Sequence, residues 1–179
     1  MDATTETRRE GTLPLLLAGL QGGMVGGLWM LAWLGLSATW QRRSFWTAEN
    51  LFASAFYGDT AIRRGFAFST LSGLALYLLL YSLLGAGFAA VVRDRVAPTR
   101  VMLLAILFSL FWYFVSFHGI WKSLLPLVYL LHAEKPAVIG HLLYGTFLGR
   151  YPEYLKLGLH PAATLPVEPV PSGEPPAPQ

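Results

Sequence analysis

The sequence predicts an all-α integral membrane protein, a bundle of four transmembrane helices with an interfacial helix between the first and the second. Hydrophobic residues make up 54% of the 179 residues and charged residues only 13%, against about 25% charged residues in soluble domains. The apolar residues stand in long uncharged blocks, and about 18 or more consecutive apolar residues indicate a membrane span. Arginines flank these blocks, as is usual for the anchors of membrane helices. The net charge of +3 therefore points to a lipid partner and not to nucleic acid.

The first span is predicted over 13–40, after a polar N-terminal segment at 1–12. Its apolar block is far longer than the roughly 7–15 apolar residues of a signal peptide, so it predicts a retained anchor. The next segment, 41–65, is mixed in polarity, with Leu51 and Ala55 at helical spacing. This segment is too short and too polar to span. It predicts an interfacial helix whose apolar face lies in the lipid or against the bundle.

Two further spans are predicted over 67–92 and 101–121, with a short polar turn between them. Residues 123–131 are apolar as well, but they contain Pro126, which lacks the donor that a helix interior needs. We expect this stretch to lie at the membrane surface, or alternatively to extend the third helix past a kink.

The fourth apolar block is short. It follows Pro136, a favourable first helical residue, and covers 137–149. Thirteen residues reach about 20 Å along a helix, against about 30 Å of hydrocarbon core. The block spans only if the bilayer thins or neighbouring helices shelter its ends. We count it as the fourth span of a transmembrane domain at 13–159, and we expect the proline-rich tail at 160–179 to be disordered.

Basic residues give little information on orientation. With four spans, both termini and the middle turn share one side. That side carries Arg8, Arg9, Arg93, Arg95, Arg100, Arg150 and Lys156, and the opposite side carries Arg42, Arg43, Arg63, Arg64, Lys122 and Lys135. Seven against six is a small bias. The concentrated turn at 93–100 favours cytoplasmic termini in a bacterial inner membrane.

Glycines spaced by four line one face of the first span. In lipid, small residues let helix backbones approach closely, and this packing drives helix association. The predicted packing residues are Gly19, Gly23 and Gly27 in the first span, Ser82, Ala86 and Ala90 in the second, and Gly145 and Gly149 in the fourth. The same pattern serves packing within one chain and homodimerisation, with the first reading favoured.

Two histidines are the candidate ligand-binding residues. His118 lies near the end of the third span and His141 near the start of the fourth, so antiparallel helices would bring both rings to similar depth. Such a pair could hold a haem, a metal ion or a quinone carbonyl. In the alternative that we favour, each imidazole bonds a backbone carbonyl, a serine or a tyrosine. Ser116, Tyr113 and Tyr144 are the candidate partners.

Several classes of chemistry find no support in the sequence. The chain has no cysteine, which excludes disulfides, thiolate metal sites and cysteine nucleophiles. It has no GxSxG, HExxH or Walker motif, and Glu49 and Asp59 form no carboxylate pair within a span. We therefore predict no catalytic residues, no metal ligands and no resident cofactor.

Two stretches, "ENLFASAFYGD" and "GHLLYGTFLGRYP", carry a resemblance. The second holds a His-x-x-Tyr-Gly-x-x-x-Gly pattern formed by His141, Tyr144, Gly145 and Gly149. It is similar to small uncharacterised bacterial inner-membrane proteins of the domain-of-unknown-function type. The resemblance implies a four-helix membrane fold and brings no activity with it.

The function expected from these observations is non-enzymatic. The chain is expected to be a structural or accessory membrane protein, or a small subunit of a membrane complex, whose partners are the lipid bilayer, other membrane subunits or a second copy. One alternative is a redox-associated subunit that holds haem or quinone through His118 and His141. Another is a transporter that works only as an oligomer, because four short helices leave little room for a pathway.

Overall fold

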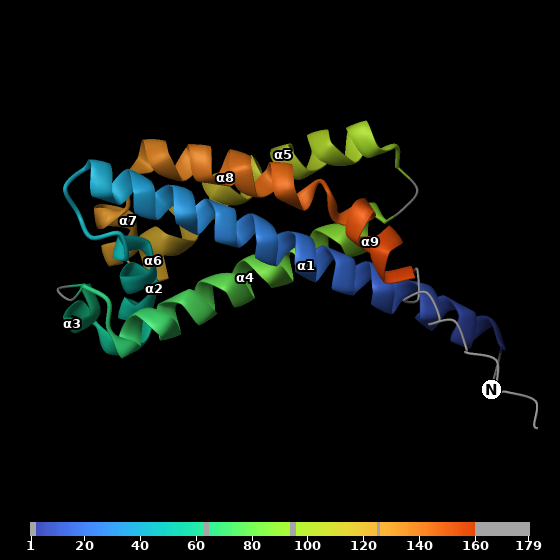
Figure 1. The fold of residues 1–179 in the computed structure, drawn as a ribbon, viewed down its shortest axis with the longest axis horizontal. Coiled ribbons are helices and arrows are strands. Elements are labelled where there is room, and N and C mark those ends of the chain that lie inside the picture. Colours follow the sequence, from blue (N-terminus) through green and yellow to red (C-terminus); the bar gives the residue numbers. More distant parts are fainter. Residues whose placement is uncertain (1–2, 63–64, 94–95, 125, 160–179) are drawn as a thin grey trace, which may run out of the picture.

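The fold of the chain is a bundle of long helices, each antiparallel to the long helix that precedes it in the sequence (Figure 1). A computed structural model describes residues 3–62, 65–93, 96–124 and 126–159, and all regular structure in these residues is helical. The long helices are α1 (Ala3–Trp40), α4 (Phe68–Val92), α5 (Pro98–Val115) and α8 (Glu134–Leu148). The predicted tail at 160–179 lies outside the described residues, and α1 already begins within the predicted polar segment at 1–12.

Short helices cluster at the two ends of the long helices (Figure 1). One end holds α2 (Thr47–Tyr57), α3 (Asp59–Ile62), α6 (Lys122–Leu124) and α7 (Pro126–Leu131), and the other end holds α9 (Tyr151–Leu159) beside the first half of α1. A π-helical segment, η1 (Ser116–Trp121), joins α5 to α6 without a break.

Three helical segments are long and apolar enough to cross a membrane, and they confirm the first three predicted spans at this level. They are Thr12–Trp40, Phe68–Val92 and Pro98–Leu124. The helix predicted from Pro136 begins two residues earlier, at Glu134, so the proline lies in the first turn of α8, where no backbone donor is needed. The 15 residues of α8 reach about 22 Å, less than the roughly 30 Å hydrocarbon core.

The segment between the first two spans forms the predicted helix, α2, and its apolar face packs on the bundle. Leu51, Phe52 and Ala53 are buried. The contact with α4 is close because Gly73 has no side chain. A β-carbon at Gly73 would lie 2.8 Å from the Ala53 nitrogen and would collide with the Glu49 carbonyl oxygen.

The stretch at 123–131 begins as an extension of the third helix, which is one of the two placements that the sequence left open. The third span runs on through η1 and α6 to Leu124, so it does extend beyond 121. The helix α7 then starts at Pro126 and packs against η1 and α2. Its Val128 side chain is only 1% exposed, so this helix contributes to the packed interior.

Glycines on α1 set its distance from two neighbouring helices. A β-carbon at Gly19 would lie 2.6 Å from the Gly85 carbonyl oxygen of α4, and one at Gly23 would lie 3.0 Å from the Ser82 Cα. The adjoining row faces α8, since a β-carbon at Gly26 would lie 2.9 Å from the Tyr144 carbonyl oxygen. Real β-carbons avoid distances below 3.0 Å, so both interfaces require a glycine.

Glycines also allow α8 to pack closely on α5. A β-carbon at Gly145 would lie 2.7 Å from the Ile106 Cα, and one at Gly149 would lie 2.9 Å from the Met102 Cα. Of the small residues predicted on the second span, Ser82 and Ala86 are buried and Ala90 is half-buried. The close contacts therefore run in the order α4–α1–α8–α5, whereas α4 and α5 make few contacts with each other.

Replacement of Gly23 by leucine should destabilise the protein strongly. The new side chain would collide with the α4 backbone, and overpacking of this kind typically costs about 1–3 kcal/mol. The measurement is thermal unfolding in mild detergent. The matched control is Gly87→Leu, because a β-carbon at Gly87 has nothing within 4 Å. An equal loss of thermal stability in the two variants would contradict the close packing of α1 on α4 at Gly23.

Candidate functional site

The polar centre of the bundle is a histidine–tyrosine pair that joins α8 to α4. His141 is 4% exposed, and Tyr81 is 2% exposed. The His141 Nδ1 lies 2.8 Å from the Ala137 carbonyl oxygen, and its Nε2 lies 3.0 Å from the Tyr81 hydroxyl oxygen. Because a carbonyl can only accept, Nδ1 carries the proton and Nε2 accepts from Tyr81. Both ring nitrogens of a neutral imidazole are thus engaged within the protein.

Further hydrogen bonds fix this pair between three helices. Ser109 of α5 donates to the His141 carbonyl oxygen. The Tyr144 hydroxyl, one turn further along α8, donates to the Tyr81 carbonyl oxygen at 2.8 Å. The Tyr113 ring of α5 stands 5.2 Å from the imidazole, measured between ring centroids. The arrangement ties α4, α5 and α8 together with groups that have no water to bond in lipid.

A small cavity adjoins the pair. It has a volume of about 10 Å³, and its polar lining residues are Tyr77, Tyr81, Tyr113, Ser116, His132 and His141. The Tyr77 side chain is buried, and its hydroxyl has no hydrogen-bond partner among the described residues. A space of this size holds one water at most.

The two histidines singled out from the sequence lie in different surroundings. His118 belongs to η1 and is exposed, with its ring packed on Phe114 at a centroid distance of 5.0 Å. The Tyr113 ring contacts both imidazoles, at 6.3 Å from His118 and 5.2 Å from His141. Tyr113 thus lies beside each ring, and both His141 nitrogens are engaged within the protein. The described residues also contain no group of three metal-ligating side chains.

His141 bonds kinds of partner that the sequence predicts, a backbone carbonyl and a tyrosine, but this tyrosine is not among the residues that were predicted. Tyr113 contacts the ring only through its face or edge, Ser116 donates to the Tyr113 carbonyl oxygen, and Tyr144 bonds the backbone of Tyr81. The actual partner, Tyr81, stacks on Tyr77 at 4.5 Å between centroids. The spacing of four between these tyrosines, in a predicted span with no other tyrosine, was the signal that could have revealed them.

A second polar group lies where α2 meets α4. Thr70 donates to the Asn50 side-chain oxygen at 2.7 Å, and Asn50 donates to the Gly65 carbonyl oxygen at 3.1 Å. Beside them Glu49 is 2% exposed, and its Oε2 has no hydrogen-bond partner in the described part of the chain. Burial raises the pKa of the Glu49 carboxyl above its ordinary value, which favours the neutral acid.

One more titratable group lines the small cavity from the turn between α7 and α8. Desolvation, with the nearby Arg43 guanidinium as a second cause, lowers the pKa of His132 to about 4. Arg43 itself donates to the Leu131 carbonyl oxygen at 2.7 Å. At neutral pH His132 is therefore uncharged, and the described cavity lining contains no charged side chain.

Comparison of the chain with protein-family models, with curated proteins and with solved structures finds no match. The resemblance of the last apolar block to small bacterial inner-membrane proteins stays a prediction. In the structure, the residues of that pattern have packing roles: His141 and Tyr144 bond α4, and Gly145 and Gly149 contact α5.

Removal of the Tyr81 hydroxyl should weaken the bundle modestly. Tyr81→Phe leaves the buried His141 Nε2 without its donor, and hydrogen bonds between membrane helices contribute about 0.6 kcal/mol on average and at most about 1.7. His118→Gln, a change at an exposed ring, should leave thermal unfolding in detergent unchanged. A double-mutant cycle of Tyr81→Phe with His141→Gln should show coupling. If the two changes lower the stability additively, the result would contradict a hydrogen bond between Tyr81 and His141.

Proposed function

We propose that the chain is a non-enzymatic integral membrane protein, a structural or accessory subunit of a membrane assembly. One observation carries the proposal. His141 and Tyr81 at the centre of the bundle bond each other, Ser109 bonds the His141 backbone, and the adjoining cavity measures about 10 Å³. Pockets for small molecules usually measure about 300–1,000 Å³. The centre of the bundle therefore suits helix packing better than catalysis or passage of a solute.

The outer surface supports the same proposal. Large hydrophobic side chains remain exposed along every long helix, including Trp29 of α1, Leu83 of α4 and Phe111 of α5. An exposed apolar surface of this extent marks contact with a membrane or with partner proteins. In a bilayer it would contact lipid and further transmembrane helices.

We further propose that α8 is a fourth span and that both termini lie in the cytoplasm of a bacterium. The helix α8 packs against both α1 and α5, which shelters part of its surface from lipid. The Trp33 indole of α1 donates to the Pro136 carbonyl oxygen at 3.0 Å. At the other end Arg150 is exposed and stacks its guanidinium on Phe147. Neighbouring helices and this snorkelling arginine compensate for the short length of α8.

Purification from the native membrane tests the function. The full chain in mild detergent should show no Soret band and no stoichiometric metal or quinone. Its particle mass should include another membrane protein or a second copy. A Soret band that His141→Gln abolishes and His118→Gln weakens would replace the proposal with the redox-associated subunit. A ligand-free particle with the mass of one chain would contradict the subunit role.

Reporter fusions test the topology. Fusions after Arg100 and within 160–179 should report the same, cytoplasmic side, and a fusion after Tyr57 should report the opposite side, because α8 would return the chain across the bilayer. The measurement is a paired assay with one reporter active only in the cytoplasm and one active only outside it. Opposite sides for Arg100 and the tail would mean that α8 does not span.

A further inference from the structure

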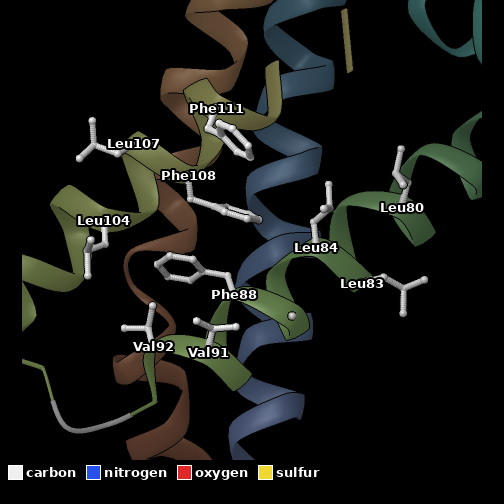
Figure 2. Close-up of a pocket in the computed structure, with 11 residues that line it drawn as sticks. Leu80, Leu83, Leu84, Phe88, Val91, Val92, Leu104, Leu107, Phe108 and Phe111 are labelled. Carbon is white, nitrogen blue, oxygen red and sulfur yellow. The ribbon is translucent and has the colours of Figure 1, made fainter. Parts of the chain in front are cut away.

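An apolar groove lies between α4 and α5. These helices follow each other in the chain, but α4 packs mainly on α1 and α5 mainly on α8, so a gap stays open between them. The groove has a volume of about 740 Å³. Figure 2 shows its lining, which consists of Leu80, Leu83, Leu84, Gly87, Phe88, Val91, Val92, Leu104, Leu107, Phe108 and Phe111.

The groove has the length of one lipid acyl chain within one leaflet. From Leu80 to Val92 the α4 wall rises by twelve residue steps, which is about 18 Å. Half of a hydrocarbon core is about 15 Å. The Phe88 and Phe108 rings lie 5.2 Å apart, measured between ring centroids, and form the floor of the groove. Gly87 keeps the wall open, because nothing lies within 4 Å of the position of its missing β-carbon.

Two arginines lie next to lining residues of the groove, at the end where α4 and α5 are joined by a turn. Arg93 directly follows the lining residue Val92, and Arg100 precedes Leu104 by one helical turn on the same face of α5. Both arginines are exposed, and neither has a carboxylate partner among the described residues. Arginine is well suited to bind the oxygens of a phosphate.

We propose that this groove is a binding site for an anionic phospholipid, with one acyl chain between α4 and α5 and the phosphate at Arg93 and Arg100. Charge and length select this occupant. A partner helix would cross the whole core of about 30 Å, whereas the groove covers about one leaflet and ends at two cations. The inference goes beyond the proposed subunit role and does not depend on it.

Lipid retention by the purified full chain tests the site. The protein in detergent is titrated with phosphatidylglycerol, phosphatidylcholine or inorganic phosphate, and bound molecules are counted by native mass spectrometry. Gly87→Phe fills the groove, and its matched control is Gly119→Phe, since a β-carbon at Gly119 also has nothing within 4 Å. The double change Arg93→Gln/Arg100→Gln removes the cations. Its control is Lys122→Gln/Lys135→Gln, two exposed cations from other parts of the chain.

The wild-type chain should retain one phosphatidylglycerol at least tenfold more tightly than phosphatidylcholine, and inorganic phosphate should not displace it. The arginine variant should lose this preference, and Gly87→Phe should lose retention of both lipids, while both controls behave as wild type. Equal retention of the two lipids by the wild type, or unchanged retention in Gly87→Phe, would overturn the proposal. A dimer that binds no lipid and that Gly87→Phe dissociates would overturn it in favour of a second copy in the groove.

Discussion

The close approach of α1 to α4 is the constraint on which the rest of the bundle depends. At Gly19 and Gly23 the two backbones meet at distances that no side chain permits. In a membrane such contact is favourable because helices gain nothing by hiding leucine from lipid and associate by packing. Once α1 is fixed on α4, its second glycine row is directed at α8, and α8 in turn uses Gly145 and Gly149 to reach α5.

This chain of contacts also explains the open side of the molecule. Each interface that closes has small residues facing a backbone, whereas the facing surfaces of α4 and α5 carry leucine, valine and phenylalanine. Side chains of this size keep the helices apart. Gly87 is the exception on the α4 side, and no residue of α5 approaches it within 4 Å. The groove thus follows from the distribution of small residues among the four helices.

The polar centre adds directional contacts to this packing. Small residues allow two helices to slide along or rotate about each other, whereas the His141–Tyr81 bond and the Ser109 bond to the His141 carbonyl define one register. The same side chains would each be costly if left unpaired in lipid. Polar atoms without partners in the described residues include those of Tyr77, which lines the small cavity, and of Glu49, which belongs to α2.

The sequence by itself determined the helical class, three helices long and apolar enough to cross a membrane, and the glycine face of α1, because block length, charge depletion and a spacing of four are local properties. It also predicted that His141 would bond a backbone carbonyl, a serine or a tyrosine. Only the tertiary structure decided that the tyrosine is Tyr81, that His118 stays outside, that α2 packs on Gly73 and that α4 and α5 leave a groove. These outcomes depend on the rotation and depth of each helix relative to its neighbours. Periodicity within one helix contains no information on either quantity.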